Sequence, residues 1–230
     1  MSSKSKKVLE IIKKHISLGQ SDINQLKQDF EALYIKFSSE QELKVESQMI
    51  EHTPYFRICS PGARQDCAVL FFHGGGFTIS STRDHMDLCG KLSLSSGVCL
   101  LSIDYWLAPE HVFPAAVEDC LDSYLWLLER GIDPSRIVLA GISAGGTLVL
   151  STLLSLRNMG LDFPATGVCM SPAVNMLFQG DSVKTSQGKD WITPERLYSL
   201  RKVYLLGQDP KQPLASPLYA DLHGLPPLMI

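Results

Sequence analysis

The sequence lacks the features that mark nucleic-acid-binding and membrane-spanning proteins. Its only concentration of basic residues lies within residues 4–14, and its formal net charge is −3, so nothing favours binding to a polyanionic backbone. No apolar run approaches the roughly 18 residues of a membrane-spanning helix, and no N-terminal segment resembles a signal peptide. We therefore expect a cytoplasmic protein with no nucleic-acid partner and no integral membrane segment.

Metal-binding and redox cysteine patterns are also missing. The sequence contains no CxxC pair and no Cys/His spacing of the kind that binds zinc. Each cysteine stands alone in an apolar context, so we expect buried free thiols and neither a metal site nor a cofactor. The cysteines concerned are Cys59, Cys67, Cys89, Cys99, Cys120 and Cys169.

What the sequence does contain is an alternation of apolar strands and amphipathic helices, long enough at 230 residues for one substantial core. Two antiparallel strands are predicted in residues 45–59. The order then predicts a doubly wound, mostly parallel α/β sheet, because right-handed crossovers gather the carboxyl ends of the strands at one edge. Buried strands are predicted at residues 67–72, 98–103, 136–141 and 165–170, and helices at residues 84–96, 114–130 and 144–159.

Three further segments complete the predicted domain organisation. Residues 7–37 carry two amphipathic helical patterns; we favour packing over a core or pocket, and docking on a membrane surface is the alternative. Another helix begins at Thr193, within a less regular stretch, and residues 225–230 resemble a buried strand. We therefore divide the chain into N-terminal cap helices (1–44), the core (45–174), a cap insertion (175–209) and a return to the core (210–230).

A serine stands at the corner between a predicted strand and a predicted helix, in Gly141-Ile142-Ser143-Ala144-Gly145. Such a sharp turn needs small neighbours, so Gly141 and Gly145 allow the backbones to pass closely and the Ser143 hydroxyl is raised as a nucleophile. A loop with incidental glycines is the alternative, because GxSxG arises by chance in about one chain of this length in ten.

A glycine loop, His73-Gly74-Gly75-Gly76, directly follows another predicted strand. At the shared edge of a parallel sheet this loop can face Ser143. A serine nucleophile needs preorganised donors for the oxyanion that it forms. We expect the donors to be the backbone N–H group of Ala144 together with N–H groups of the loop from Gly74 to Gly76.

Four motifs in this order resemble the hormone-sensitive lipase-like esterases. They are HGGGF at residues 73–77, DYWLAPEHVFPAAVEDC at 104–120, GISAGG at 141–146 and PLASPLYADLHGLPP at 213–227. The resemblance covers about residues 45–230. It implies an α/β-hydrolase that cleaves carboxylic esters of short or medium acyl chains through an acyl-serine, without metal or cofactor.

The resemblance also implies roles and partners. Ser143 is the implied nucleophile, and the implied oxyanion donors are Gly75, Gly76 and Ala144. Phe77 and Trp191 are expected to shape the substrate pocket. The partner is a small-molecule ester, and a homo-oligomer stays open. The family usually has Asp where this chain has Ile142, and often Arg where it has Trp106.

The base that Ser143 needs is not evident in the sequence. In the α/β-hydrolase order the acid and the histidine follow the serine, and only His223 does so here, in a polar turn where we do not expect a base. We expect surface positions for His15 and His52, a structural part for His73 in its loop, and capping or packing for His85 and His111.

The family places its acid and histidine beyond the final strand, after residue 230. We therefore expect a truncated chain that lacks the last two strands, exposes an apolar sheet edge and has little or no turnover. Two alternatives to an esterase stay open. One is a small-molecule-binding protein on the same fold, as in relatives that resemble gibberellin receptors and have lost the catalytic histidine, and the other is an inactive fragment.

Overall fold

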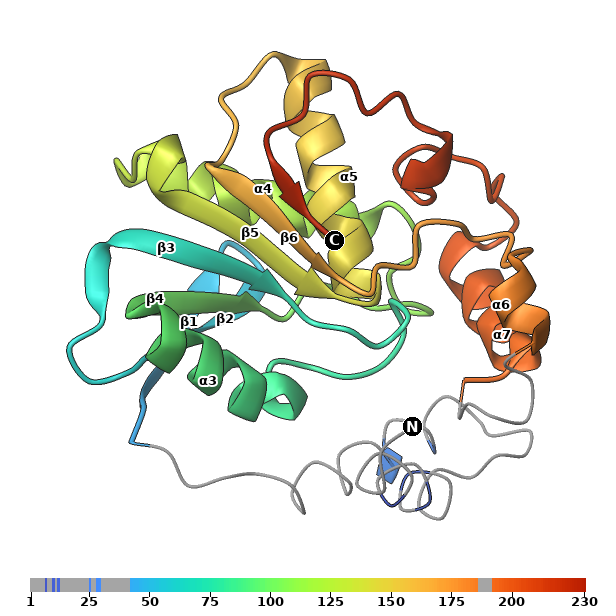
Figure 1. Ribbon diagram of the computed structural model, residues 1–230, viewed down its shortest axis with the longest axis horizontal. Coiled ribbons are helices and arrows are strands. Elements are labelled where there is room, and N and C mark those ends of the chain that lie inside the picture. Colours follow the sequence, from blue (N-terminus) through green and yellow to red (C-terminus); the bar gives the residue numbers. More distant parts are fainter. Residues whose placement is uncertain are drawn as a thin grey trace.

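The computed structural model describes residues 42–185 and 192–230, together with positions 7, 10, 12, 25, 28 and 29. The helices expected in residues 7–37 and the side chain of Trp191 lie outside the described residues. Within the described ranges the chain forms a seven-stranded sheet with helices on both faces (Figure 1). No helix in these ranges combines the length and the apolar character needed to cross a membrane.

The sheet has the strand order β1-β2-β4-β3-β5-β6-β7. β1 and β2 are antiparallel, β2 is antiparallel to β4, and all later pairs are parallel. The predicted doubly wound, mostly parallel α/β sheet is confirmed. The strands are β1 (Lys44–Ile50), β2 (Thr53–Cys59), β3 (Arg64–Phe72), β4 (Val98–Ile103), β5 (Ile137–Ile142), β6 (Thr166–Met170) and β7 (Leu228–Met229).

Helices cover the sheet on both sides, which explains the continuous apolar runs of β3 and β4. The helix α3 packs on one face, against β2 and β4, whereas α4 and α5 pack together on the other (Figure 1). The buried side chains accordingly form two clusters, one on each face. The helices are α3 (Met86–Ser96), α4 (Ala115–Glu129), α5 (Ala144–Met159), α6 (Asp181–Thr185) and α7 (Pro194–Leu205).

Local end signals set the helix boundaries. Gly97 and Gly160 have φ of 66° and 67° and end α3 and α5 in the left-handed conformation that glycine adopts without a steric penalty. At the start of α7, the Thr193 side chain accepts a hydrogen bond from the N–H of Arg196 at 3.3 Å, and Pro194 occupies the first helical position. Because these signals are local, the ends of α3 and α5 and the start of α7 could be predicted from the sequence.

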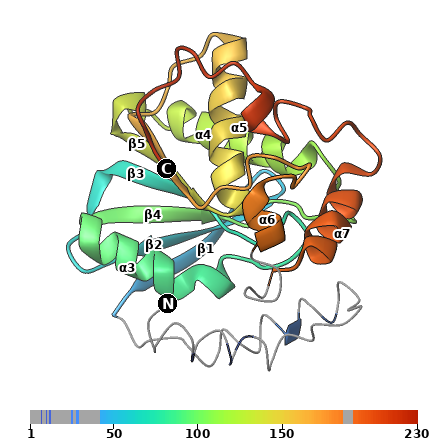
Figure 2. The same cartoon turned by 45° about the vertical axis from the view of Figure 1, so that its right-hand side comes forward.

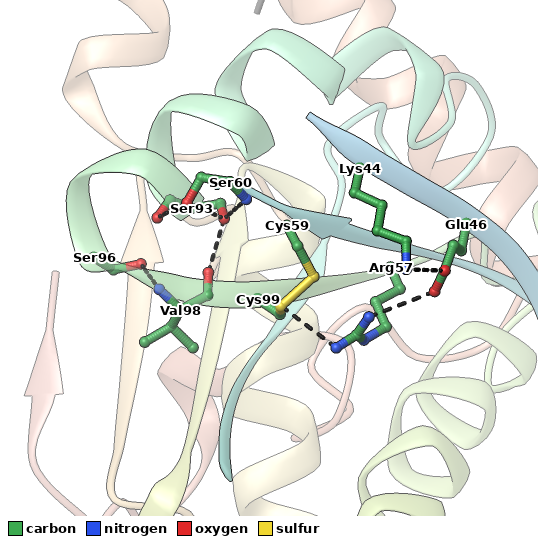
Figure 3. The surroundings of a disulfide bond; sticks show 9 residues. All are labelled: Lys44, Glu46, Arg57, Cys59, Ser60, Ser93, Ser96, Val98 and Cys99. Carbon is green, nitrogen blue, oxygen red and sulfur yellow. Dashed lines mark hydrogen bonds and ion pairs between the residues drawn. A yellow bond between two sulfur atoms is a disulfide. The ribbon is translucent and has the colours of Figure 1, made fainter. Parts of the chain in front are cut away.

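The prediction that all six cysteines are buried free thiols was wrong. Cys59 and Cys99 form a disulfide bond (Figure 3), and Cys67 is only half-buried. The antiparallel register of β2 against β4 pairs Ile58 with Leu100. Cys59, which follows Ile58, therefore lies opposite Cys99, which precedes Leu100, and their Cα atoms are 4.4 Å apart. The three other cysteines, Cys89, Cys120 and Cys169, are buried free thiols as predicted.

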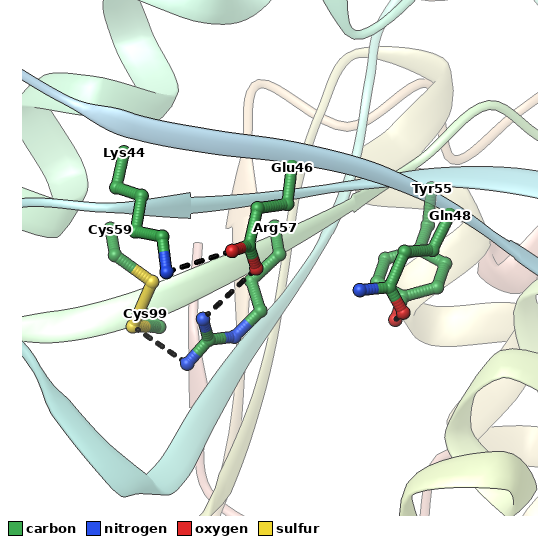
Figure 4. A network of polar contacts seen from close by, with 7 residues as sticks. All are labelled: Lys44, Glu46, Gln48, Tyr55, Arg57, Cys59 and Cys99. Carbon is green, nitrogen blue, oxygen red and sulfur yellow. Dashed lines mark hydrogen bonds and ion pairs between the residues drawn. A yellow bond between two sulfur atoms is a disulfide. The ribbon is translucent and has the colours of Figure 1, made fainter.

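A surface ion network lies beside this disulfide (Figure 4). The Arg57 guanidinium is 3.4 Å from Glu46 and donates to the Cys99 sulfur at 3.6 Å, and Lys44 is 2.8 Å from Glu46. Exposed pairs of this kind contribute little to stability. Cys99 is near the amino end of β4, so the network and the disulfide lie away from the edge where the carboxyl ends of the strands meet.

Candidate active site

The two loops singled out in the sequence meet at one edge of the sheet. β3 and β5 are neighbours, and their register places Phe72 opposite Gly141. Both strands are parallel, so the residues that follow them emerge on the same side. Ser143 and the loop that begins at His73 are therefore brought together, as predicted.

Ser143 lies on a strained turn between β5 and α5. Its φ and ψ are 54° and −118°, a combination that non-glycine residues rarely adopt. The turn is held because the Ser143 N–H donates to the Met170 carbonyl at 2.9 Å, and the Ser143 carbonyl accepts from the Thr147 N–H at 3.2 Å. This is the geometry of a nucleophile elbow.

The glycines beside Ser143 are required by close backbone contacts. A Cβ atom on Gly145 would lie 1.9 Å from the Phe72 carbonyl oxygen, and one on Gly141 would lie 2.3 Å from the Gly145 carbonyl oxygen. No side chain fits at such distances. The two glycines therefore let α5 start directly against the ends of β3 and β5.

Hydrogen bonds fix the orientation of the glycine loop. The Gly74 carbonyl accepts a hydrogen bond from His73 Nδ1 at 2.6 Å, and the Gly75 carbonyl accepts from the N–H groups of Thr78 and Ile79 at 3.2 and 3.1 Å. In a planar trans peptide, the N–H of the next residue points away from the carbonyl. The directions of the Gly75 and Gly76 N–H groups are thus set by their own peptide planes.

The N–H groups of the glycine loop and of the start of α5 are available to donate hydrogen bonds to a ligand. Among the described residues, no hydrogen bond uses the N–H of Gly75, Gly76 or Ala144. Ala144 begins α5, and the first N–H groups of a helix have no partner within the helix. Donors of this type are suited to a developing negative charge.

The loop and the elbow border one cavity of about 240 Å³. Its lining is mostly apolar, and it includes Ser143 and, as expected, Phe77. The helix α7 supplies part of the wall, and Figure 2 shows α6 and α7 beside the carboxyl ends of the strands. The lining residues are Gly74, Gly75, Gly76, Phe77, Ile79, Ser80, His85, Ile142, Ser143, Ala144, Ala173, Met176, Phe178, Ile192, Arg196, Leu197, Leu200 and Arg201.

The sequence did not predict which residues of α7 face the site. A Cβ atom on Gly76 would lie 2.7 Å from Leu200 Cδ1, so the Leu200 side chain packs directly on the glycine loop. Helical spacing showed that this segment has an apolar stripe, but not what the stripe contacts. The contact is between residues more than a hundred positions apart.

His73 and His85 are both close to the glycine loop, and both are neutral. His73 is buried, its ring stacks on Tyr105 at 4.2 Å, and burial, followed by the neighbouring His85, lowers its pKa to about 3. Burial also lowers the pKa of His85. The structural part expected for His73 fits this arrangement. The cavity-facing position of His85 was not predicted.

The other described histidines do not line this cavity. His223 is exposed in its turn, and its carbonyl accepts a hydrogen bond from Arg157 of α5 at 3.0 Å. The Ser143 hydroxyl makes no hydrogen bond with the part of the chain that the structure describes. In the same part, no three His, Cys, Asp or Glu side chains are grouped to hold a metal ion.

The unusual Trp106 belongs to a separate cluster. Its backbone N–H donates to the buried carboxylate of Asp119 at 2.7 Å, and His52 Nε2 is 3.1 Å from the other oxygen of that carboxylate. The rings of His52 and His111 both contact the indole, with centroids 4.5 and 3.6 Å from it. His52 is exposed at the surface, as expected, and it also pairs with Asp119.

Comparison with known proteins agrees with the α/β-hydrolase fold seen in the structure. Residues 69–230 match the α/β-hydrolase fold family. The chain is 41% identical over 170 residues to an acetyl-hydrolase from Streptomyces hygroscopicus, which covers 73% of this chain and 57% of the relative. It is 34% identical over 164 residues to an esterase from Acinetobacter venetianus, covering 70% and 54%. The chain thus spans less than two thirds of the length of these curated relatives.

Solved structures agree closely. An esterase from the bacterial hormone-sensitive lipase family superposes with a TM-score of 0.95 at 40% identity, over 99% of this chain and 77% of that one. EstE5, in a crystal soaked with p-nitrophenyl butyrate, gives a TM-score of 0.92 at 34% identity, over 99% and 77%. The chain therefore belongs to the α/β-hydrolase fold family, in which it is similar to proteins of the hormone-sensitive lipase family.

Proposed function

We propose that this protein is a serine carboxylesterase in which Ser143 attacks the carbonyl carbon of a small-molecule ester. The observation that supports this most directly is the position of Ser143. It lies on a strained turn, in the wall of an apolar cavity, opposite backbone N–H groups that have no other acceptor among the described residues.

The proposed reaction follows from these positions. The Ser143 oxygen bonds to the carbonyl carbon, and the carbonyl oxygen becomes an oxyanion that Gly75, Gly76 and Ala144 bind through their N–H groups. The alcohol then leaves, and water hydrolyses the acyl-serine. Loss of one such donor typically costs about 100- to 1000-fold in kcat.

The Ser143 proton must pass to a base. His85 is the one histidine in the cavity wall among the described residues, but its Nε2 accepts the Gly74 N–H at 3.3 Å. We therefore do not assign His85 as the base that accepts the Ser143 proton.

The size and apolar lining of the cavity favour an ester with a short or medium apolar acyl chain.

The experiment is hydrolysis of p-nitrophenyl butyrate by the longest natural chain that contains this sequence and by its Ser143→Ala variant. We expect p-nitrophenol release in the first and a loss of at least about 1000-fold in the second. Ser96→Ala is a matched control, because this exposed hydroxyl on α3 is bonded to the Leu92 carbonyl, away from the cavity. Equal rates for the protein and Ser143→Ala would refute Ser143 as the nucleophile.

A second candidate function has one observation in its favour. The Ser143 hydroxyl has no hydrogen-bonded base among the described residues, which also suits a small-molecule-binding protein on this fold. Saturable binding of p-nitrophenyl butyrate, without any release of p-nitrophenol or acylation of Ser143 detected by mass, would favour that candidate over the esterase.

A further inference from the structure

The first peptide group of the glycine loop, between His73 and Gly74, is held at both ends. Its carbonyl accepts a hydrogen bond from the Tyr105 hydroxyl at 2.8 Å, and its N–H donates to His85 Nε2 at 3.3 Å. The next two peptide groups are held through their carbonyls. Glycine has the largest backbone freedom of any residue, so a loop of three glycines keeps one shape only if such contacts fix each plane.

The contacts of His85 determine its tautomer. Nδ1 lies 3.1 Å from the Ser81 carbonyl, which can only accept, so Nδ1 carries the proton. Nε2 is then free of hydrogen and accepts from Gly74. The neutral ring therefore links two loops, and a protonated ring would present an N–H to the Gly74 N–H.

Neighbouring aromatic rings surround the His85 imidazole. His85 precedes α3, and its ring lies 6.2 Å from Phe71 and 5.8 Å from the His73 ring, measured between centroids. A Cβ atom on Gly74 would be 3.5 Å from His85 Nε2. This distance is an ordinary van der Waals contact, so the imidazole packs directly against the backbone at Gly74.

We infer that His85 is a positioning residue of the ester-hydrolysis site: its neutral imidazole holds the Gly74 N–H and so fixes the first peptide plane of the glycine loop, to which the planes that carry the Gly75 and Gly76 N–H groups are joined. This inference rests on the proposed function. His85 itself transfers no proton to the substrate.

The charged surroundings of His85 define its pH response. Burial lowers its pKa and favours the neutral ring, whereas the Ser81 carbonyl and the carboxylates of Asp84 and Asp104 act in the opposite direction. His73, which faces it from the glycine loop, is neutral. The folded-state pKa of His85 therefore lies below the ordinary value for histidine. When the pH falls below that folded-state pKa, the ring should become protonated, release the Gly74 N–H and lower kcat.

The first test measures kcat and KM for p-nitrophenyl butyrate in His85→Leu and His85→Gln. His111→Leu is the matched control, because His111 belongs to the separate cluster around Trp106. Leucine has no acceptor, so we expect kcat to fall about 100-fold with KM changed less than threefold. Glutamine can accept from Gly74 and does not titrate. We expect it to restore kcat to within about tenfold and to remove the acid loss that is due to His85.

Equal kcat in His85→Leu and the unmodified protein, with Ser143→Ala inactive, would overturn the inference while leaving the esterase proposal intact. A second test needs no turnover. Long-range ¹⁵N–¹H spectra at pH 7 should show His85 with a protonated Nδ1 and a bare Nε2. A bare Nδ1, or a charged ring at that pH, would overturn the inference even if the protein is not an esterase.

Discussion

At the residue scale, Gly145 is where three parts of the backbone meet. It begins the first turn of α5, it faces the carboxyl end of β3, and its carbonyl lies next to Gly141. The neighbouring Gly146 is less confined, since a Cβ atom there would contact Pro172 at 3.1 Å. Two adjacent glycines therefore differ sharply in what a methyl group would meet.

We predict that Gly145→Ala destabilises the protein by about 3 kcal/mol or more, because the methyl group would overlap a main-chain carbonyl that cannot move aside. Gly146→Ala should cost less than about 1 kcal/mol, since a helix interior favours alanine over glycine. Urea unfolding followed by circular dichroism measures both. Similar midpoints for the two variants would contradict the close-approach argument.

At the scale of elements, α7 is attached to the core at one end and contacts the site with one face. Near its carboxyl end, the Tyr204 ring stacks on Phe77 with centroids 4.0 Å apart, and the Tyr204 carbonyl accepts the Phe113 N–H at 2.9 Å. One turn earlier, Leu200 packs on Gly76. The assignment of residues 175–209 to a cap stays a prediction, and α7 is the part of it that would limit the substrate.

For Leu200→Ala we predict a shift of preference toward longer acyl chains. Removal of the side chain opens apolar volume beside the glycine loop, and each extra buried methylene of a substrate contributes about 0.8 kcal/mol, or roughly fourfold in kcat/KM. The measurement is the ratio of kcat/KM for p-nitrophenyl octanoate and butyrate.

Leu206→Ala is the control for this shift, because Leu206 ends the same helix and is 71% exposed. The control should leave the octanoate-to-butyrate ratio unchanged. An unchanged ratio in Leu200→Ala as well would show that Leu200 does not limit the acyl chain.

At the scale of the whole molecule, two histidines at the site connect folding to pH, His73 buried and His85 partly buried. His73 and His85 both have folded-state pKa values below the ordinary value of 6.5. Below pH 6.5 the unfolded chain binds protons at these rings that the folded chain does not. The free energy of unfolding must then decrease as the pH falls toward the folded-state values.

We predict a loss of stability between pH 6.5 and pH 5, with a slope that approaches 1.4 kcal/mol per pH unit for His73, whose pKa is lowered to about 3, and a further loss in the same direction from His85. Asp104, whose carboxyl pKa is raised by burial, opposes this loss at lower pH. Urea unfolding at half-unit steps of pH measures the slope. His85→Gln should show a smaller slope, and an identical one would contradict the assignment of a lowered pKa to His85.

Local sequence signals were sufficient for most of the fold. The period of the apolar residues placed the strands and helices, and α5 runs from Ala144 to Met159 as predicted. Glycines around residues 75 and 143 located the glycine loop and the elbow, because only glycine satisfies those backbone angles and distances. Parallel crossovers then required the two loops to share an edge.

The sequence by itself thus determined the α/β sheet, the elbow at Ser143 and the glycine loop opposite it. Only the tertiary structure decided that Cys59 pairs with Cys99, that Leu200 covers Gly76, and that His85 holds Gly74. The physical reason is the range of the interactions. Backbone conformation and apolar periodicity are encoded within a few residues, whereas these three contacts join different elements, and their partners are fixed only once the elements pack in register.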